Sequence, residues 1–87
     1  MALNKEDIEV GMSIWFLGKS HTHKWISDLA GYNGLWIGSH VILTISQVED
    51  RFFSIIYGEN DYQIYHSELH EFDIVPEVVL KSERYGI

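Results

Sequence analysis

Cysteine is absent from this 87-residue chain, so neither a disulfide nor a thiolate metal ligand can stabilise it. The absence is typical of a protein from a reducing compartment. Long apolar runs are also missing, since no stretch approaches the roughly 18 residues that a transmembrane helix needs. The opening residues, MALNKEDIEVGM, lack the basic and apolar regions of a secretory signal peptide. We therefore expect an intracellular, cytoplasmic protein that does not bind membranes.

Basic residues are scarce: 6 Lys and Arg stand against 13 Asp and Glu, which gives a formal net charge of −7. Lys19, His21, His23 and Lys24 form one local basic cluster, which is too small to outweigh the field of the whole molecule. Because nucleic-acid affinity depends mainly on neutralising phosphates, this composition argues against DNA or RNA as a partner.

Hydrophobic residues make up 46% of the chain and aromatic residues 14%, which is generous for such a short sequence. This composition favours a folded core over disorder. A chain of this size buries only about 60–65% of its unfolded surface, so its stability margin is small. No internal repeat or linker divides the sequence, and residues 1–87 are expected to form a single domain.

The first third of the chain mixes one strand signal with many turn signals. Asn4 is placed to cap a helical turn over residues 5–8, and Gly11 ends this turn. Residues 12–17 are an apolar run suited to a first strand. The segment 18–34 is rich in turn residues and is expected to be a long loop. One or two helical turns are expected inside it, because three apolar residues have i, i+3 and i+4 spacing: Trp25, Ile26 and Leu29.

A period of two marks strands in the rest of the chain. Val41, Leu43 and Ile45 recur at every second position, which is the side-chain period of a strand. Glu49-Asp50 and the run from Gly58 to Asp61 are turn signals. The pattern predicts strands over 41–46, 51–57, 62–66 and 72–75, with a helical turn over 68–70 capped by Ser67 and a stop at Pro76.

Three stretches carry a resemblance to a known group: DIEVGMSIWF, VILTISQVEDRFFSIIYGENDYQIY and HSELHEFDIV. Their order resembles the small SH3-like barrels, including the KOW and Tudor-like types, over about residues 6–76. The resemblance implies an all-β, five-stranded barrel with a long loop after the first strand and a one-turn helix before the last. The strand before the long loop and the strand after the helical turn are the expected partners for closing the barrel, because closure removes exposed sheet edges. The extension 77–87 is left open as a strand, a docking helix or a tail.

No arrangement typical of an enzyme is present. The sequence contains no Ser-His-Asp order, no phosphate-binding P-loop and no dinucleotide-binding glycine pattern. Turns favour acidic residues because their side chains bond to nearby backbone, so the carboxylates at turns need no catalytic role. These residues are Asp28, Glu49, Asp50, Glu59 and Asp61. We therefore expect a protein without enzymatic activity and without a cofactor.

Four of the five histidines form pairs that raise an alternative function. His66 and His70 are neighbours if their turn is helical, and His21 and His23 share a face if theirs is a strand. Together they suggest a metal- or small-ligand-binding domain, since imidazole is a common zinc ligand. Ser67 occupies the position that glutamate takes in the metalloprotease pattern. The opposing interpretation is that these are ordinary turn and loop histidines.

The aromatic residues of the predicted loop are the main candidates for partner binding. Exposed Trp and Tyr are frequent anchors of protein interfaces. Trp15 or Trp36 is expected in the core, whereas Trp25 and Tyr32 lie where the core has less room for them. The alternative is that the loop folds back and covers one end of the barrel with these rings. The candidate partner-binding residues are Trp25, Tyr32, Trp36, Lys24 and Asp28.

The sequence therefore predicts a non-enzymatic protein-interaction module whose long loop and C-terminal segment contact a protein partner. Its acidic surface is expected to steer it toward a partner with a basic surface. Small, acidic, cysteine-free chains of this kind resemble proteins that phages use to bind or inhibit host proteins, including as mimics of nucleic-acid charge. A metal- or ligand-binding domain is the first alternative. A homo-oligomeric structural protein assembled through residues 77–87 is the second, because Val78, Val79 and Leu80 are costly to leave in water.

Overall fold

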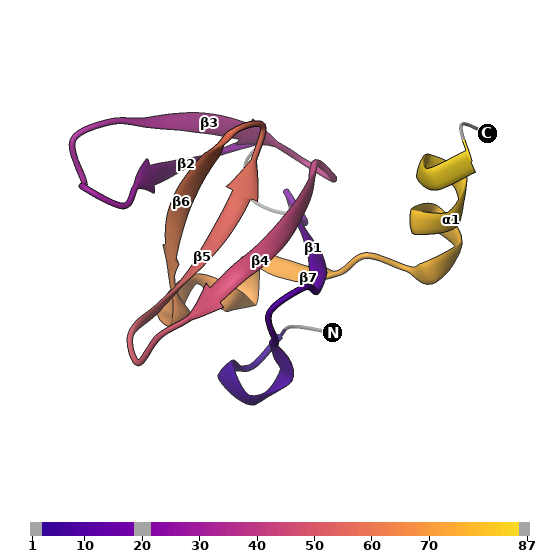
Figure 1. Cartoon of the computed structure of the whole chain (residues 1–87), viewed down its shortest axis with the longest axis horizontal. Coiled ribbons are helices and arrows are strands. Elements are labelled where there is room, and N and C mark those ends of the chain that lie inside the picture. Colours follow the sequence, from indigo (N-terminus) through magenta and orange to yellow (C-terminus); the bar gives the residue numbers. More distant parts are fainter. Residues whose placement is uncertain (1–2, 19–21, 86–87) are drawn as a thin grey trace.

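The structure is a computed structural model that describes residues 3–18 and 22–85. Its strands form one curved antiparallel sheet in the order β3-β2-β6-β5-β4-β1-β7 (Figure 1). The elements are η1 (Lys5–Asp7), β1 (Ser13–Phe16), β2 (His23–Asp28), β3 (Gly34–Gly38), β4 (Ile42–Val48), β5 (Phe52–Tyr57), β6 (Asn60–Tyr65), η2 (His66–Glu71), β7 (Phe72–Ile74) and α1 (Glu77–Tyr85).

The core lies on one face of the sheet, because alternate residues of each strand point to the same side. Each of the strands β1 to β7 contributes at least one side chain that is no more than 2% exposed. Burial of such a side chain stabilises the fold by about 1.5–3 kcal/mol. The largest fully buried side chains are Ile14, Phe16, Ile37, Leu43, Ile45, Phe53, Ile55, Ile64 and Phe72.

The predicted meander is confirmed. The strands β4, β5 and β6 pair in sequence order, with Ile45 opposite Ile55 and Phe53 opposite Ile64. A register shift between Ile45 and Gln47 adds one residue to β4. The pairing of the first and last predicted strands is also confirmed, since β1 pairs with β7 as well as with β4. The all-β class therefore holds, but the sheet has seven strands where the sequence predicted five.

The two additional strands come from the segment predicted to be a long loop with helical turns, and that prediction was wrong. β2 and β3 form a hairpin in which Trp25 lies opposite Trp36. Along β2, Lys24 and Ile26 are buried while Trp25 is exposed, so the period of two is present. The hydrophobicity pattern of the sequence does not show this period, because the charged residue Lys24 occupies one of the inward positions. Asp28 closes the hairpin by accepting hydrogen bonds on Oδ1 from the N–H groups of Gly31 and Tyr32, at 2.7 and 3.2 Å.

The short helical turns lie where they were predicted, with one change at a cap. The N–H of Asn4 donates to Asp7 Oδ2 at 3.0 Å, which supports η1. η2 covers His66–Glu71, so Ser67 lies inside it and the predicted Ser67 cap was wrong. The residue before the helix is Tyr65, whose N–H donates to Glu68 Oε2 at 3.1 Å. η2 places Leu69, which is 2% exposed, in the core.

The segment after Pro76 is helical, which decides among the three possibilities left open by the sequence. α1 begins at Glu77, and the carbonyl of Pro76 accepts from the N–H groups of Val79 and Leu80. Figure 1 shows the helix standing away from the sheet at the end of a short extended connection. Among the described residues, no helix is long and apolar enough to cross a bilayer.

Gly34 is required where β2 and β3 approach each other. A methyl group on Gly34 would collide with the carbonyl oxygen of Ile26 and lie 2.7 Å from Cζ2 of Trp25. On the same strand, a methyl group on Gly38 would lie 3.9 Å from the His23 ring, which is an ordinary contact. Alanine substitutions at these two glycines of β3 can therefore be compared, because only the one at Gly34 causes a collision.

We expect Gly34→Ala to destabilise the protein by about 1–3 kcal/mol, because overpacking displaces backbone as well as the Trp25 ring. Gly38→Ala should be neutral or stabilising by up to about 1 kcal/mol, since it restricts the unfolded chain. Urea denaturation followed by far-UV circular dichroism measures both values. Equal stability of the two variants would contradict the close approach at Gly34.

Candidate functional site

A hollow opens on the solvent-facing side of the sheet, between β2 and the corner formed by β6 and η2. β2 is paired with β6 at two positions, Ser27 with Gln63 and Asp28 with Tyr62. Toward the start of β2, Trp25 and Tyr65 line the hollow from opposite sides, and Glu68 lies at its η2 end. The hollow has a volume of about 340 Å³, within the range of sites that hold a side chain or small ligand. We call it the aromatic hollow; its residues are Trp25, Ile26, Ser27, Gly31, Gln63, Tyr65 and Glu68.

Two tryptophans form a pair on the hairpin beside this hollow. The ring centroids of Trp25 and Trp36 lie 5.5 Å apart with the planes at 64°, an edge-to-face arrangement. The exposed fractions are 47% for Trp25 and 65% for Trp36. Tyr32, in the hairpin turn, is 89% exposed. The hairpin therefore presents large aromatic rings to solvent instead of folding them into the core.

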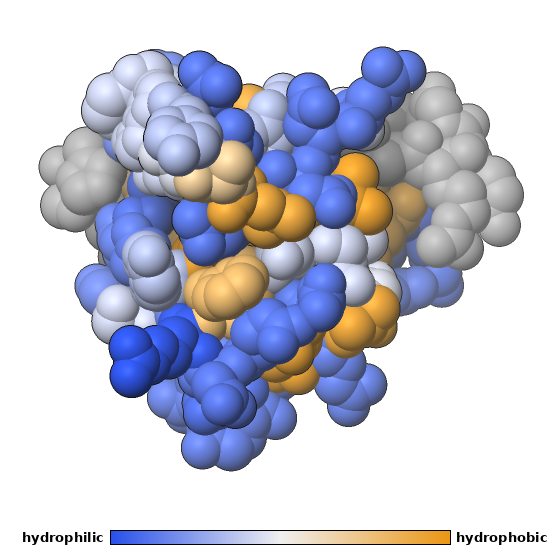
Figure 2. Space-filling model, turned by 60° about the vertical axis from the view of Figure 1, so that its left-hand side comes forward, coloured by the Kyte–Doolittle hydropathy of each residue, from blue (hydrophilic) through white to orange (hydrophobic). Residues whose placement is uncertain are grey.

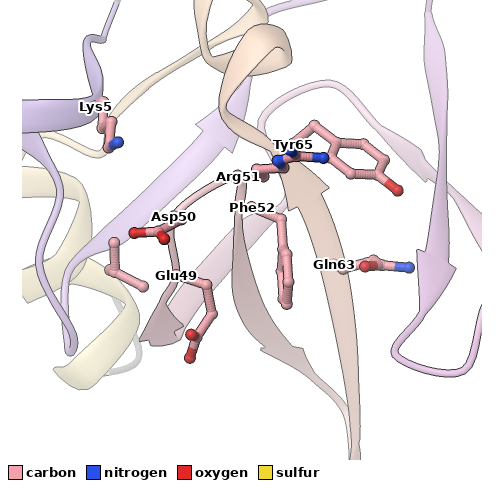
Figure 3. Close-up of a pocket in the computed structure, with 8 residues that line it drawn as sticks. Lys5, Glu49, Asp50, Arg51, Phe52, Gln63 and Tyr65 are labelled. Atoms are coloured by element: carbon pink, nitrogen blue, oxygen red, sulfur yellow. The ribbon is translucent and has the colours of Figure 1, made fainter.

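A second groove lies on the other side of Tyr65. It has a volume of about 720 Å³ and shares Tyr65 and Gln63 with the aromatic hollow. Phe52 faces Tyr65 across β5 and β6. In Figure 3, Tyr65 and Gln63 extend to one side of Phe52, while Glu49 and Asp50 lie on the other. The remaining lining residues are Lys5, Val48 and Arg51.

These features together make a continuous surface across β3, β2, β6 and β5. We call it the aromatic strip and define it as Trp36, Trp25, Tyr65 and Phe52. Figure 2 views the molecule from nearer the hairpin side and shows pale and orange side chains gathered among blue ones. A strip that alternates aromatic and polar groups is typical of protein-contact surfaces, where rings supply contact area and polar groups supply direction.

An ion triad fixes the inner side of the aromatic hollow. Lys24 Nζ lies 2.7 Å from Glu68 Oε1 and 2.8 Å from Glu71 Oε2, and the Lys24 side chain is only 10% exposed. Burial by itself lowers the pKa of Lys24, but the hydrogen bonds and charges of Glu68 and Glu71 outweigh it and raise the pKa above its usual value. The triad connects β2 to η2, and so sets the distance between the two sides of the hollow.

The sequence-predicted binding residues separate into two groups in the structure. Trp25, Trp36 and Tyr32 are exposed on the hairpin, so Trp36 does not take the core position considered for it. Lys24 is buried in the ion triad, and Asp28 closes the hairpin turn. Four of the five lie in the segment predicted to be a loop, which together with Trp36 forms the β2–β3 hairpin.

Three residues of the site were missed because they lie on other elements. Tyr65 and Phe52 come from the meander, and Glu68 comes from η2. The only signal in the sequence is that Phe52 and Tyr65 occupy outward positions of predicted strands. Glu68 has no such signal. Trp15, the other core candidate, is half-buried and contacts the ring of His40 edge-on at 4.7 Å.

The candidate metal-binding histidines make separate local contacts. His66 Nε2 lies 2.7 Å from the carbonyl oxygen of Glu49 and therefore carries the hydrogen, because a carbonyl only accepts. His70 Nδ1 lies 3.0 Å from the carbonyl of Ser67, and His23 is exposed on β2. His21 lies outside the described residues. In residues 3–18 and 22–85, no group of three or more His, Cys, Asp or Glu side chains is placed to hold a metal ion.

Comparison of the chain with protein-family models, curated proteins and solved structures finds no match. The interpretation of the aromatic strip therefore depends on the contacts and exposure of this chain's own residues. Two observations carry most weight: the exposed tryptophan pair on the hairpin, and the hollow that separates it from Tyr65.

We expect Lys24→Met to destabilise the protein by about 3 kcal/mol near neutral pH, since it leaves Glu68 and Glu71 facing each other without the ammonium. Because the pKa of Lys24 is raised in the folded state, its contribution is present below about pH 10.4 and is lost as the pH rises through the folded value. The stability gap between the wild type and Lys24→Met should therefore narrow at higher pH.

Urea denaturation at pH 7, 9 and 11 measures this gap. Lys5→Met is the matched control, because Lys5 is exposed and its replacement should change stability by less than about 0.5 kcal/mol. A gap that stays constant between pH 7 and pH 11 would show that Lys24 acts through packing and not through its charge.

Proposed function

We propose that this protein is a non-enzymatic protein-interaction module that binds its partner through the aromatic strip. The observation that carries the proposal is the exposed Trp25–Trp36 pair beside a hollow lined by Tyr65. Large aromatic rings gathered at one surface are expensive to leave hydrated, and such rings contribute most of the binding energy at many interfaces. The other face of the same hairpin packs into the core, yet the tryptophan rings face solvent. A role in binding a partner accounts for this exposure.

The proposed partner is a protein with a basic surface. The chain carries a net charge of −7, and acidic side chains lie at both ends of the strip. Glu68 lies at the aromatic hollow, and Glu49 and Asp50 lie beside Lys5 and Arg51 at the second groove. Opposite charge speeds association and selects the orientation of the partner. Arg or Lys side chains of the partner would also be attracted to the faces of Trp25 and Tyr65.

We also propose that the fold is an SH3-like barrel of the KOW or Tudor-like kind. The element order supports this, because a first strand is followed by a hairpin, a three-stranded meander, a short helical turn and a last strand paired with the first. The hairpin takes the place of the long loop. The acidic, cysteine-free composition resembles that of phage proteins that bind or inhibit host proteins, and such a host protein is the partner that we favour.

The test is capture of partners from a lysate of the host cells by immobilised protein. We expect a Trp25→Ala, Tyr65→Ala double variant to lose captured proteins by at least about tenfold, since hot-spot aromatics each contribute about 2 kcal/mol or more. Tyr57→Ala is the matched control: Tyr57 is 40% exposed and lines neither the aromatic hollow nor the second groove. Capture of the same proteins at equal yield by all three forms would rule out the aromatic strip as the binding surface.

The basic character of the partner is tested separately with the captured protein once it is identified. Its association rate should fall by about tenfold or more between low salt and about 0.5 M salt, because steering between charged surfaces is screened. Stopped-flow measurement with tryptophan fluorescence follows the rate. An association rate that does not depend on salt would exclude electrostatic steering while leaving the role of the aromatic strip intact.

A further inference from the structure

The sheet has two outer strands, and they differ in how well their free edges are protected. β7 has three residues, contains Asp73 and is followed by Pro76 after one residue. Shortness, charge and proline are the usual ways in which natural sheets prevent an edge from pairing with another chain. β3 has five residues, Gly-Leu-Trp-Ile-Gly, with no charge and no proline. Among the described residues it pairs with β2 alone, and Figure 1 shows it at the rim of the sheet.

The backbone of β3 is oriented to accept another strand. The N–H of Asp28 donates to the carbonyl of Asn33 at 2.8 Å, which makes these two residues a hydrogen-bonded pair. Hydrogen-bonded and non-hydrogen-bonded pairs alternate along antiparallel strands. From the register of β2 and β3, Trp36 then falls in a non-hydrogen-bonded pair with Trp25. Its N–H and C=O therefore point away from β2, toward the free edge.

The sequence of β3 is nearly symmetric about this residue. If a second copy pairs antiparallel about a two-fold axis through Trp36, then Trp36 meets its own counterpart and Leu35 meets Ile37 of the other copy. Both apolar residues lie toward the core side, where Ile37 is buried and Leu35 is half-buried. The two glycines, Gly34 and Gly38, meet at the ends. Such an interface uses the same patch on both subunits, which is the commonest arrangement in homodimers.

Charge also favours this edge over other surfaces for contact between copies. Each chain carries −7, so two copies repel each other wherever their acidic side chains approach. Over the five residues of β3 there is no charged side chain to repel the second copy. The β7 edge, in contrast, would bring Asp73 of one copy toward Asp73 of the other.

We propose that two copies of the chain associate through β3, edge to edge and antiparallel, with Trp36 at the two-fold axis. This joins the two sheets into one and places the Trp25–Trp36 pairs of both copies side by side on its outer surface. The proposal goes beyond the proposed function: it uses the backbone edge of β3, and Trp36 is the one residue of the aromatic strip that lies on this edge. One strand pair is a small interface, so the dimer is expected to be weak and to depend on concentration.

Sedimentation equilibrium between about 10 μM and 1 mM tests the proposal, since small interfaces give weak association. We expect the wild type to dimerise and Trp36→Pro to weaken association by about tenfold or more. Proline removes the outward N–H and is tolerated at a free edge. Trp25→Ala, on the neighbouring strand and the same face, is the matched control and should change association less than about twofold. A wild type that stays monomeric at about 1 mM would overturn the proposal.

Deletion of residues 77–87 distinguishes this interface from assembly through α1. The shortened chain should dimerise as the wild type does, and loss of the dimer on deletion would overturn β3 pairing in favour of the C-terminal helix. Loss of the dimer in Trp25→Ala but not in Trp36→Pro would also overturn it, because the faces and not the edges would then be in contact.

Disulfide crosslinking gives a second test that does not depend on how well Trp36→Pro folds. The chain has no cysteine, so Trp36→Cys introduces a single thiol. Residues opposite each other in a hydrogen-bonded pair have Cα atoms about 5.5 Å apart, which suits a disulfide. In the control Ser39→Cys, the two thiols would be about 20 Å apart in the proposed register. Oxidation should crosslink Trp36→Cys in preference to Ser39→Cys, and equal or absent crosslinking in both would contradict the register.

Discussion

The contact on which the site depends is the one between Lys24 and the two carboxylates of Glu68 and Glu71. These partners are 44 and 47 residues away from Lys24 along the chain. Lys24 occupies an inward position on β2, where an apolar side chain would be the ordinary choice. An ammonium group in that position is tolerated because two carboxylates replace its lost hydration. The hairpin is therefore held against η2 by charge, at the point where its pairing with β6 has ended.

The ion triad contributes to the separation of β2 and η2 beside the hollow. A hydrophobic contact at Lys24 would draw β2 and η2 together, because apolar side chains gain by excluding the space between them. The long lysine side chain and its two acceptors hold the backbones at a fixed distance instead. Trp25, the next residue, then points outward on the opposite face of the strand. The ion triad thus lies on the inner side of β2, while the alternation of side chains along this strand turns Trp25 outward to form one wall of the hollow.

The sequence predicted the meander correctly and the hairpin incorrectly. In both cases the outcome depends on whether the inward positions of the strands hold hydrophobic residues. In β4 and β5 the inward positions hold Leu43, Ile45, Phe53 and Ile55, so hydrophobicity follows the strand period. In β2 one of the two buried inward positions is taken by Lys24, whose partners lie far away in the sequence and cannot be inferred from the local pattern. The candidate site was found in part through its exposed tryptophans. Tyr65 and Phe52 were missed because only the register of β5 and β6, and the way β2 lies against them, brings them to the same surface.

The pairing of β1 with β7 has a consequence for how the chain folds. Ile14 lies opposite Ile74, so this contact closes a loop of 60 residues, whereas the turns of the meander each join neighbouring strands. Closing a long loop costs entropy before the contact is rewarded. The meander is thus the part of the sheet that can assemble from local contacts, and the burial of Phe16 against Phe72 comes late. The chain should fold on the slower, millisecond-to-second timescale of sheet proteins, with the two ends of its sequence meeting last.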